Sequence, residues 1–294
     1  MTHPVPSPRA RELVRGAFDP YVHVAPDFAP RRITDLELAH RHRELDLAGF
    51  GLMSHYTATA ERAAVVNAAV GQPLALGSIV LNHAVGGLNA TAVEIAAREG
   101  ARFVWLPTVS ASHEFAQAEH ADPDGNVPVW VRFELELRAA GARPQAVPID
   151  DALGPVLDIV ARHGLVLVTG HLSRDEVFAV VEAANVPHVV VSGPEFPSHR
   201  ISPEDQVALA DQGALLMRAF TTPYTGKCTW DDVFTATRAV GAHSTVWCSD
   251  LGQVFNPPVE DGLALMADRH LDAGFSEEEI RIMAVENTRR LAGV

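Results

Sequence analysis

The chain has 294 residues, 47% of them hydrophobic, and its 23 basic and 37 acidic side chains give a net charge of −14. The acidic residues are spread along the chain, which disfavours nucleic acid and anionic membranes as partners because both require a basic patch. The sequence shows no signal-peptide pattern and no apolar run of roughly 18 residues, the length of a membrane helix. Cys228 and Cys248 fit neither a disulfide framework nor a zinc spacing, so we expect a cytoplasmic protein.

The first hundred residues alternate short β-rich runs with longer amphipathic stretches, which predicts βα units in a parallel sheet. In the first run, residues 18–27, a strand would place Asp19, Tyr21 and His23 on one face. Thr34 can cap a helix that runs to about residue 48. Three further strands are predicted at 50–55, 74–81 and 102–106, with helices at about 58–70 and 90–99.

This periodicity fails between residues 109 and 150, where histidines, acids and prolines replace it. The segment is longer than ordinary connections, and loops of this length are usually functional lids or disordered. Trp130, Phe133 and Leu135 indicate that it is at least partly ordered and packs over something. We therefore predict an insertion after the fourth strand that acts as a lid.

The βα pattern resumes at residue 151. Strands are predicted at 165–169, 188–192, 214–220 and 245–248; helices at about 151–163, from Ser173 to about 185, from Ser202, at about 230–240, 258–273 and 276–291. Eight strands alternating with helices predict an α/β fold, a (β/α)₈ TIM barrel forming one domain over residues 1–294, with an extra C-terminal helix. The alternative is an open doubly wound sheet, but no glycine-rich phosphate loop follows the first strand.

Catalytic groups of a barrel gather at the carboxyl ends of its strands. The polar residues predicted at those ends are Tyr21, His23, His55, Asn82, Thr108, His171, Ser192 or Glu195, Arg218 and Asp250. Each could instead be a hydrogen-bonded rim residue. The histidines that fall on helices, His40, His42, His163 and His270, are expected to be solvated.

Imidazoles and a carboxylate that converge on one point support two kinds of chemistry. They could hold zinc or a similar ion and leave one position open for an activated water. Without a metal, the same groups could act as general acid and base.

Several segments, in chain order, carry a shared motif pattern: Asp19-Pro-Tyr-Val-His23, Ala25-Pro-Asp27, Ser54-His55-Tyr56, Leu81-Asn82, Gly86-Gly-Leu-Asn89, Val104-Trp-Leu-Pro-Thr108, Gly170-His-Leu-Ser173 and Ser249-Asp-Leu-Gly-Gln253. Together they resemble the amidohydrolase superfamily of barrel enzymes, and more closely an uncharacterised, divergent branch of it. The resemblance implies hydrolytic activity and divalent metals. It also implies that His23 and His171 are metal ligands and that Asp250 binds metal and takes a proton from the attacking water.

The chain departs from that pattern at three ligand positions. Tyr21 replaces the first histidine of the His-x-His pair, and a phenol with a pKa of about 10 is a poor zinc ligand at neutral pH. Met53 stands where the resemblance implies a bridging lysine, and Ser192-Gly193 where it implies a histidine. A two-metal site is therefore not expected; one divalent ion on His23, His171 and Asp250, or none, remains open.

The resemblance to amidohydrolases leads us to expect an enzyme that hydrolyses a C–N, lactone or ester bond of a small organic molecule. Asp250 would be the general base, with His171, His23 and Tyr21 as catalytic partners. Substrate contacts are expected from His55, Asn82, Thr108 and Glu195, and from Arg218 through a bidentate pair with a carboxylate. The open alternatives are a metal-independent lyase or dehydratase and a non-catalytic binding or partner subunit. The chain could also assemble as a homo-oligomer.

Overall fold

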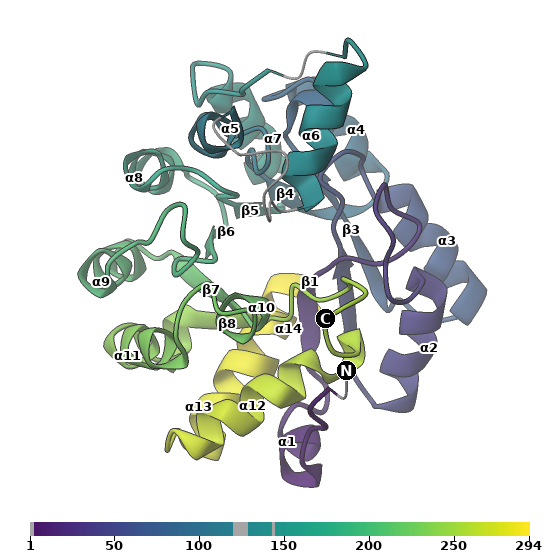
Figure 1. Cartoon of the computed structure of the whole chain (residues 1–294), viewed down its shortest axis with the longest axis vertical. Helices are drawn as coiled ribbons and strands as arrows, with labels where there is room; N and C mark the ends of the chain where they lie inside the picture. Colours follow the sequence, from purple (N-terminus) through teal and green to yellow (C-terminus); the bar gives the residue numbers. More distant parts are fainter. Residues whose placement is uncertain (1–2, 120–128, 143–144) are drawn as a thin grey trace.

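Eight parallel strands follow one another in chain order around a ring, with helices outside it (Figure 1). The computed structural model describes residues 3–119, 129–142 and 145–294, without the side chains of 117–119 and 129–130. The strands are β1 (Phe18–Val22), β2 (Gly49–Leu52), β3 (Ala75–Val80), β4 (Ala101–Trp105), β5 (Val166–Val168), β6 (His188–Ser192), β7 (Leu215–Ala219) and β8 (Thr245–Cys248). The predicted (β/α)₈ barrel is confirmed.

The helices that cover the ring are α1 (Pro8–Leu13), α2 (Asp35–Glu44), α3 (Ala60–Val70), α4 (Ala90–Arg98), α7 (Leu153–His163), α8 (Arg174–Ala183), α9 (Pro203–Asp211), α11 (Trp230–Val240), α12 (Gly262–Asp272), α13 (Glu277–Arg281) and α14 (Asn287–Ala292). The caps predicted from the sequence form at Thr34 and Ser202, whose hydroxyls accept from a backbone N–H of the first turn. At Ser173 the carboxylate of Glu176 accepts from the backbone N–H and the hydroxyl of Ser173. No described helix is long and apolar enough to cross a membrane.

Some elements lie outside the predicted strands and helices: α5 (Ser112–Glu119), α6 (Val129–Ala139), α10 (Thr221–Tyr224) and the 3₁₀ turns His83–Val85 and Ala242–Ser244. The 3₁₀ turn Val259–Asp261 and the π-helical turn Ile282–Glu286 fall within the helices predicted at about 258–273 and 276–291. Helices α5 and α6 belong to the predicted insertion. Residues 120–128 and 143–144 of that insertion, and the Trp130 side chain, lie outside the described residues.

The ring closes where β1 meets β8. The N–H of His23 donates to the carbonyl of Leu251 at 2.8 Å, and the N–H of Asp250 donates to the carbonyl of Tyr21 at 2.9 Å. The β1–β2 register shifts between Asp19 and Val22. Phe18 and Tyr21 therefore both face the interior although they are three residues apart.

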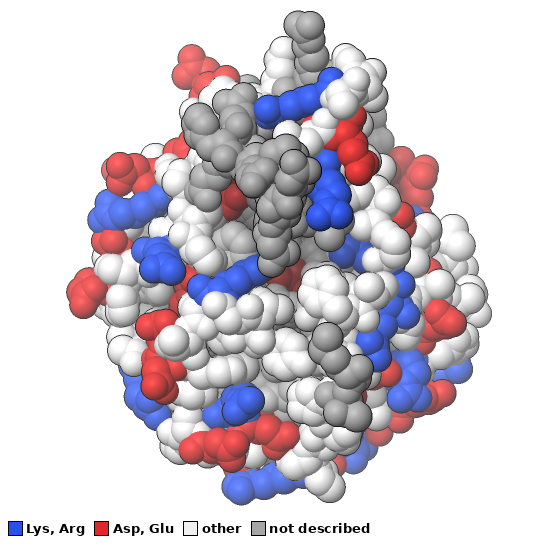
Figure 2. Space-filling model, viewed as in Figure 1, with Lys and Arg blue, Asp and Glu red and all other residues white. Residues whose placement is uncertain are grey.

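Apolar side chains fill the inside of the ring, as in other eight-stranded barrels. Bulky members of this interior cluster include Phe18, Tyr21, Met53, Phe103, Trp105 and Met217. Two further clusters pack the outer faces of the strands against the helices. Because the interior is filled, only the ends of the barrel offer room for chemistry. Acidic and basic side chains are interspersed over the described part of the face in Figure 2.

Candidate functional site at the barrel mouth

The carboxyl ends of the strands bring four of the predicted residues together. His23, His55, His171 and Asp250 follow β1, β2, β5 and β8. The ring centres of His23 and His55 are 5.2 Å apart, and those of His55 and His171 are 6.2 Å apart. Asp250 lies beside His23. These side chains form a connected cluster at one end of the barrel, which we call the mouth.

The carboxylate of Asp250 is held from two sides. Thr221 Oγ1, on α10, donates to Oδ2 at 2.6 Å, and His23 Nε2 lies 3.3 Å from Oδ1. Burial acts to raise the pKa of Asp250, but His23, Lys227 and Thr221 outweigh it and hold the pKa below its ordinary value. Its φ of 53° is uncommon for a residue with a side chain. A backbone held in this conformation fixes the direction of an ionised carboxylate.

Tyr21 shares the nitrogen of His23 that faces Asp250. Its Oη lies 3.2 Å from His23 Nε2. Because Asp250 is ionised, Nε2 carries the hydrogen between them, so Tyr21 Oη accepts from Nε2. The phenol hydrogen then remains for Asp250 or for an oxygen atom of a bound molecule. Burial, followed by the charge of Asp250, raises the pKa of Tyr21 well above its ordinary value, so the phenol stays a donor.

Two glycines let the backbone approach these residues closely. A Cβ on Gly252 would lie 1.4 Å from the carbonyl oxygen of His23, and Gly252 has a φ of 137°. A Cβ on Gly170 would lie 2.4 Å from the carbonyl oxygens of Leu106 and Pro107. The strand ends that carry His23 and His171 can therefore pack as they do only with glycine at these positions.

A buried amide and a hydroxyl orient His55. Asn82 Nδ2 donates to Thr108 Oγ1 at 2.8 Å and to the carbonyl of His55 at 2.9 Å. Thr108 Oγ1 lies 2.8 Å from His55 Nδ1 and can donate to it, which leaves the ring hydrogen on Nε2. Burial, and then the charges of His23 and His171, lower the pKa of His55 well below its ordinary value. Asn82 and Thr108 are fully buried, so they position a neutral imidazole.

Glu114 is a mouth residue that the sequence reasoning missed. It lies on α5, and its Oε1 is 3.6 Å from Nδ1 of His171. Neither atom has a hydrogen-bond partner among the described residues. Burial raises the pKa of Glu114 and lowers that of His171 to about 3. The one available signal was His113-Glu114 soon after the fourth strand, where no periodic pattern marked a helix.

Arg218 and Glu195 lie together inside the barrel wall. Arg218 Nη1 donates to Glu195 Oε1, and Nη2 donates to Gln206 Oε1 at 2.9 Å. Arg218 is fully buried. Its terminal nitrogens therefore serve an internal ion pair, and the guanidinium fork that we expected to face a substrate carboxylate is occupied.

Three expectations about individual side chains need correction. His42 and His270 were expected to be solvated, but their exposed fractions are 1% and 0%, and both pack against aromatic rings. Asp19 was expected beside Tyr21 and His23, but the register shift in β1 breaks that alternation. Its Oδ1 instead accepts from the N–H groups of Tyr21 and Ser249 at 3.3 and 3.0 Å. Burial raises the pKa of Asp19 to about 7.

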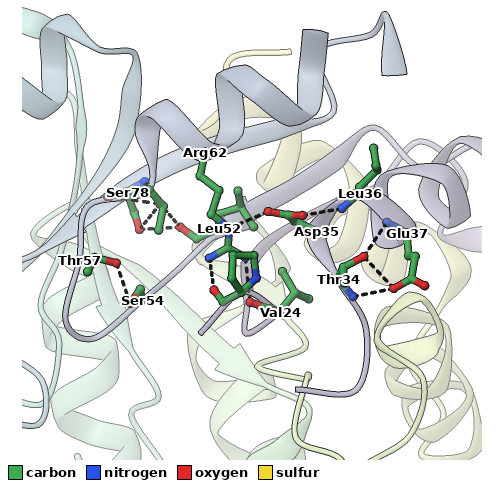
Figure 3. Close-up of polar contacts among 12 residues, drawn as sticks. Val24, Thr34, Asp35, Leu36, Glu37, Leu52, Ser54, Thr57, Arg62 and Ser78 are labelled. Atoms are coloured by element: carbon green, nitrogen blue, oxygen red, sulfur yellow. Dashed lines mark hydrogen bonds and ion pairs between the residues drawn. The ribbon is translucent and has the colours of Figure 1, made fainter. Parts of the chain in front are cut away.

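Arg62 fixes the loop that follows His23 (Figure 3). Its Nη2 donates to the carbonyl of Val24 and its Nη1 to that of Pro26, both at 2.8 Å. Its Nε pairs with Asp35 Oδ2 at 2.6 Å. One side chain on α3 therefore ties together the loop after β1 and the start of α2.

Helix α6 packs against the loops on the β1–β2 side of the mouth. The rings of Phe28, Tyr56 and Phe133 lie 4.6 to 4.9 Å apart, and Tyr56 Oη donates to Glu134 at 3.2 Å. On the other side, His113 of α5 contacts the carbonyl oxygen of Ser198 after β6. The described part of the insertion thus contacts the loops on both sides.

The donor set at the mouth does not fit a metal centre. Among the described residues, no three His, Cys, Asp or Glu side chains lie close enough to hold one ion. His23 Nε2 is engaged by Tyr21 and Asp250, and His171 Nδ1 faces Glu114. The potential ligands form pairs, whereas a structural or catalytic zinc takes at least three protein ligands.

Comparisons with known proteins agree with this architecture. The model of a Family of unknown function (DUF6282) matches residues 16–217. No curated protein matches the chain. Three solved structures are similar at low identity, and at that level the likeness shows the fold alone.

The first is an amidohydrolase from Pseudomonas aeruginosa, 13% identical, covering 98% of this chain and 100% of its own, with a TM-score of 0.62. The second is a beta-aspartyl dipeptidase from Fervidobacterium islandicum AW-1 in complex with a beta-Asp-Leu dipeptide, 12% identical, covering 94% and 72%, with a TM-score of 0.59. The third is an amidohydrolase from Burkholderia multivorans with bound zinc, 11% identical, covering 95% and 99%, with a TM-score of 0.53.

Proposed function

The chain belongs to the Family of unknown function (DUF6282), and we propose that it is an amidohydrolase-like enzyme that hydrolyses a C–N, ester or lactone bond of a small organic molecule. The observation that carries the proposal is Asp250, an ionised carboxylate fixed at the mouth by Thr221 and His23 with a lowered pKa. A carboxylate that is ionised at neutral pH and held in one direction can accept a proton from water, and it is its position, more than its basicity, that supports this role. The fold shared with amidohydrolases and a dipeptidase supports the reaction class.

The proposed step uses the side chains of the mouth alone. Asp250 takes a proton from a water molecule while the water oxygen attacks the substrate carbonyl carbon. Tyr21, which remains protonated, donates a hydrogen bond to the oxygen that becomes negative. When the tetrahedral intermediate collapses, Asp250 returns its proton to the leaving nitrogen or oxygen. His23 keeps its Nε2 hydrogen throughout and orients both groups.

We derive no step through a metal ion, because the described donors form pairs. The Burkholderia multivorans neighbour has bound zinc, so the need of this chain for a metal ion has to be measured. Two measurements test whether turnover needs a metal ion: elemental analysis of protein purified without chelators, and activity before and after dialysis against a chelator. Turnover that survives chelation supports the proposal. A stoichiometric divalent ion whose removal abolishes turnover, and whose return restores it, contradicts it.

A lyase or dehydratase is the second candidate, and the Tyr21 phenol beside Asp250 favours it. Such a pair can remove a proton next to a carbonyl group and protonate a leaving hydroxyl. Reaction in ¹⁸O-labelled water separates the two reactions. Hydrolysis places the label in the new carboxylate, whereas elimination leaves the product unlabelled.

The experiment that tests the proposal is a turnover screen with purified protein against amides, esters and lactones of small organic acids. Product formation by the wild type, at a rate above that of a variant with Asp250 replaced, supports it. A protein that binds members of the panel but converts none of them is a binding subunit, and that result overturns the proposal.

A further inference from the structure

Lys227 lies on the loop after α10, between β7 and α11. It is the only lysine of the chain, beside 22 arginines. Its backbone N–H donates to the carbonyl of Thr222 at 3.0 Å, so the base of the side chain is fixed one residue after Gly226, which has a φ of 75°. The strand order places this loop beside β8, which leads into Asp250.

The ammonium of Lys227 is directed at the mouth. Its Nζ lies 4.6 Å from the ring centre of Phe196, and Phe196 stacks on His171 with ring centres 5.6 Å apart. The charge of Lys227 lowers the pKa of Asp250 and opposes the rise at Glu114. A positive group therefore lies close enough to both carboxylates to act on them.

Among the described residues, Lys227 contacts the Phe196 ring but forms no ion pair with a carboxylate. Asp250 lies beside His23, Glu114 faces the neutral His171, and Glu195 pairs with Arg218 in the barrel wall, so none of these carboxylates pairs with Lys227. Lys227 is also exposed, whereas Arg218 is fully buried. An anion that enters the mouth thus meets Lys227 and not Arg218.

We propose that Lys227 binds a carboxylate of the substrate, so that the substrate of the proposed hydrolase is a small monocarboxylate. The inference rests on the proposed function for the reaction but not for the binding. A singly charged group matches the charges present, because a doubly charged phosphate would face one cation with Asp250 nearby. The Phe196 ring beside Nζ offers an apolar surface for the carbon chain that carries the carboxylate.

A single lysine makes the binding step directly observable. Reductive methylation with ¹³C-formaldehyde labels Lys227 and the chain's α-amine and preserves the positive charge. We would titrate the labelled protein with benzoate and N-benzoylglycine, and in parallel with the matched amides of both acids. The Lys227 methyl signal should shift saturably with the carboxylates, and the amides should bind about two- to fivefold more weakly, the discrimination expected of one exposed charge pair.

Variants complete the test by an independent thermal-shift measurement. Lys227→Gln should weaken carboxylate binding about two- to fivefold, and Lys227→Arg should retain most of it. Arg200→Gln is the matched control, since Arg200 is an exposed cation after β6 whose charge acts on Cys228 and Asp232. It should bind carboxylates as the wild type does.

Carboxylates that leave the Lys227 signal unchanged, or amides that shift it equally, overturn the inference. Arg200→Gln weakening binding as much as Lys227→Gln also overturns it, because general charge attraction would then suffice. These readouts do not depend on turnover. A protein that hydrolyses neutral and anionic substrates equally well keeps the proposed function and refutes the role of Lys227 alone.

Discussion

The hydrogen bond from Thr221 to Asp250 should be measurable as a coupling free energy. The perturbation is the pair Thr221→Val and Asp250→Asn, made singly and together. Valine keeps the shape of the buried threonine, and asparagine tolerates the positive φ of position 250. The cycle therefore measures how much stronger the Thr221 hydrogen bond is with a charged acceptor than with a neutral one.

The size of the coupling free energy between Thr221 and Asp250 follows from the geometry of their hydrogen bond. A hydrogen bond to a charged group contributes about 1.5–3 kcal/mol and a neutral one about 1 kcal/mol, and the asparagine variant retains the neutral bond. With a distance of 2.6 Å and a side chain of Asp250 that is 18% exposed, we expect a coupling of about 1 kcal/mol. Thr221→Val should also raise the pKa of Asp250, because it removes a hydrogen bond to the ionised carboxylate.

The assay is urea unfolding of the wild type, the two single variants and the double variant at pH 7. Thr225→Val is the control, because Thr225 donates to the backbone carbonyl of Thr221 at 2.7 Å and not to Asp250. Its coupling with Asp250→Asn should be close to zero. A Thr221–Asp250 coupling no larger than that of Thr225 would refute the reasoning.

Four further predictions follow from other parts of the structure. Glu195→Gln should destabilise the fold by about 3–5 kcal/mol in urea, because it leaves buried Arg218 without its counter-charge, and Glu195→Gln with Arg218→Met should recover most of that loss. Arg62→Met should cost about 1–3 kcal/mol and speed hydrogen exchange in the loop after His23, whereas Arg98→Met, in an exposed pair on α4, should cost less than about 0.5 kcal/mol. The pKa of Asp19 is raised to about 7 in the folded protein, so the unfolded state releases that proton at a lower pH and wild-type stability should fall as the pH rises from about 4 to 7. In urea unfolding, Asp19→Asn should flatten this dependence of stability on pH. An unchanged dependence would assign it to other groups. Tyr21→Phe should lower the rate of the proposed hydrolysis about 10- to 100-fold with little change in KM, and an equal loss of binding and rate would argue against an oxyanion role.

The barrel was predictable because its signals are local. Repeated βα periodicity, the capping residues Thr34, Ser173 and Ser202 and the polar residues at strand ends are read within a few positions of one another. His23, His55, His171 and Asp250 were predicted to meet because the carboxyl ends of all strands share one rim. Their grouping required only the strand order.

The remaining features depend on contacts between distant segments. Arg218 looked available at a strand end, and only the fold shows that Glu195 and Gln206 occupy it. Glu114 lies beside His171 because α5 forms inside a stretch whose sequence shows no periodicity. The sequence places Lys227 on a loop, but only the fold shows that its ammonium lies over the ring of Phe196. The register shift in β1 that separates Asp19 from Tyr21 likewise leaves no mark in the alternation of residues.

The central claim is that Asp250 is the base of a hydrolytic site, and the rate of the Asp250→Asn variant tests it most directly. With the best substrate from the amide, ester and lactone panel, kcat should fall at least about 10²-fold relative to the wild type, while the variant remains folded and binds that substrate with similar affinity. A kcat within about threefold of the wild type would contradict the claim, because no general base can be removed at so small a cost.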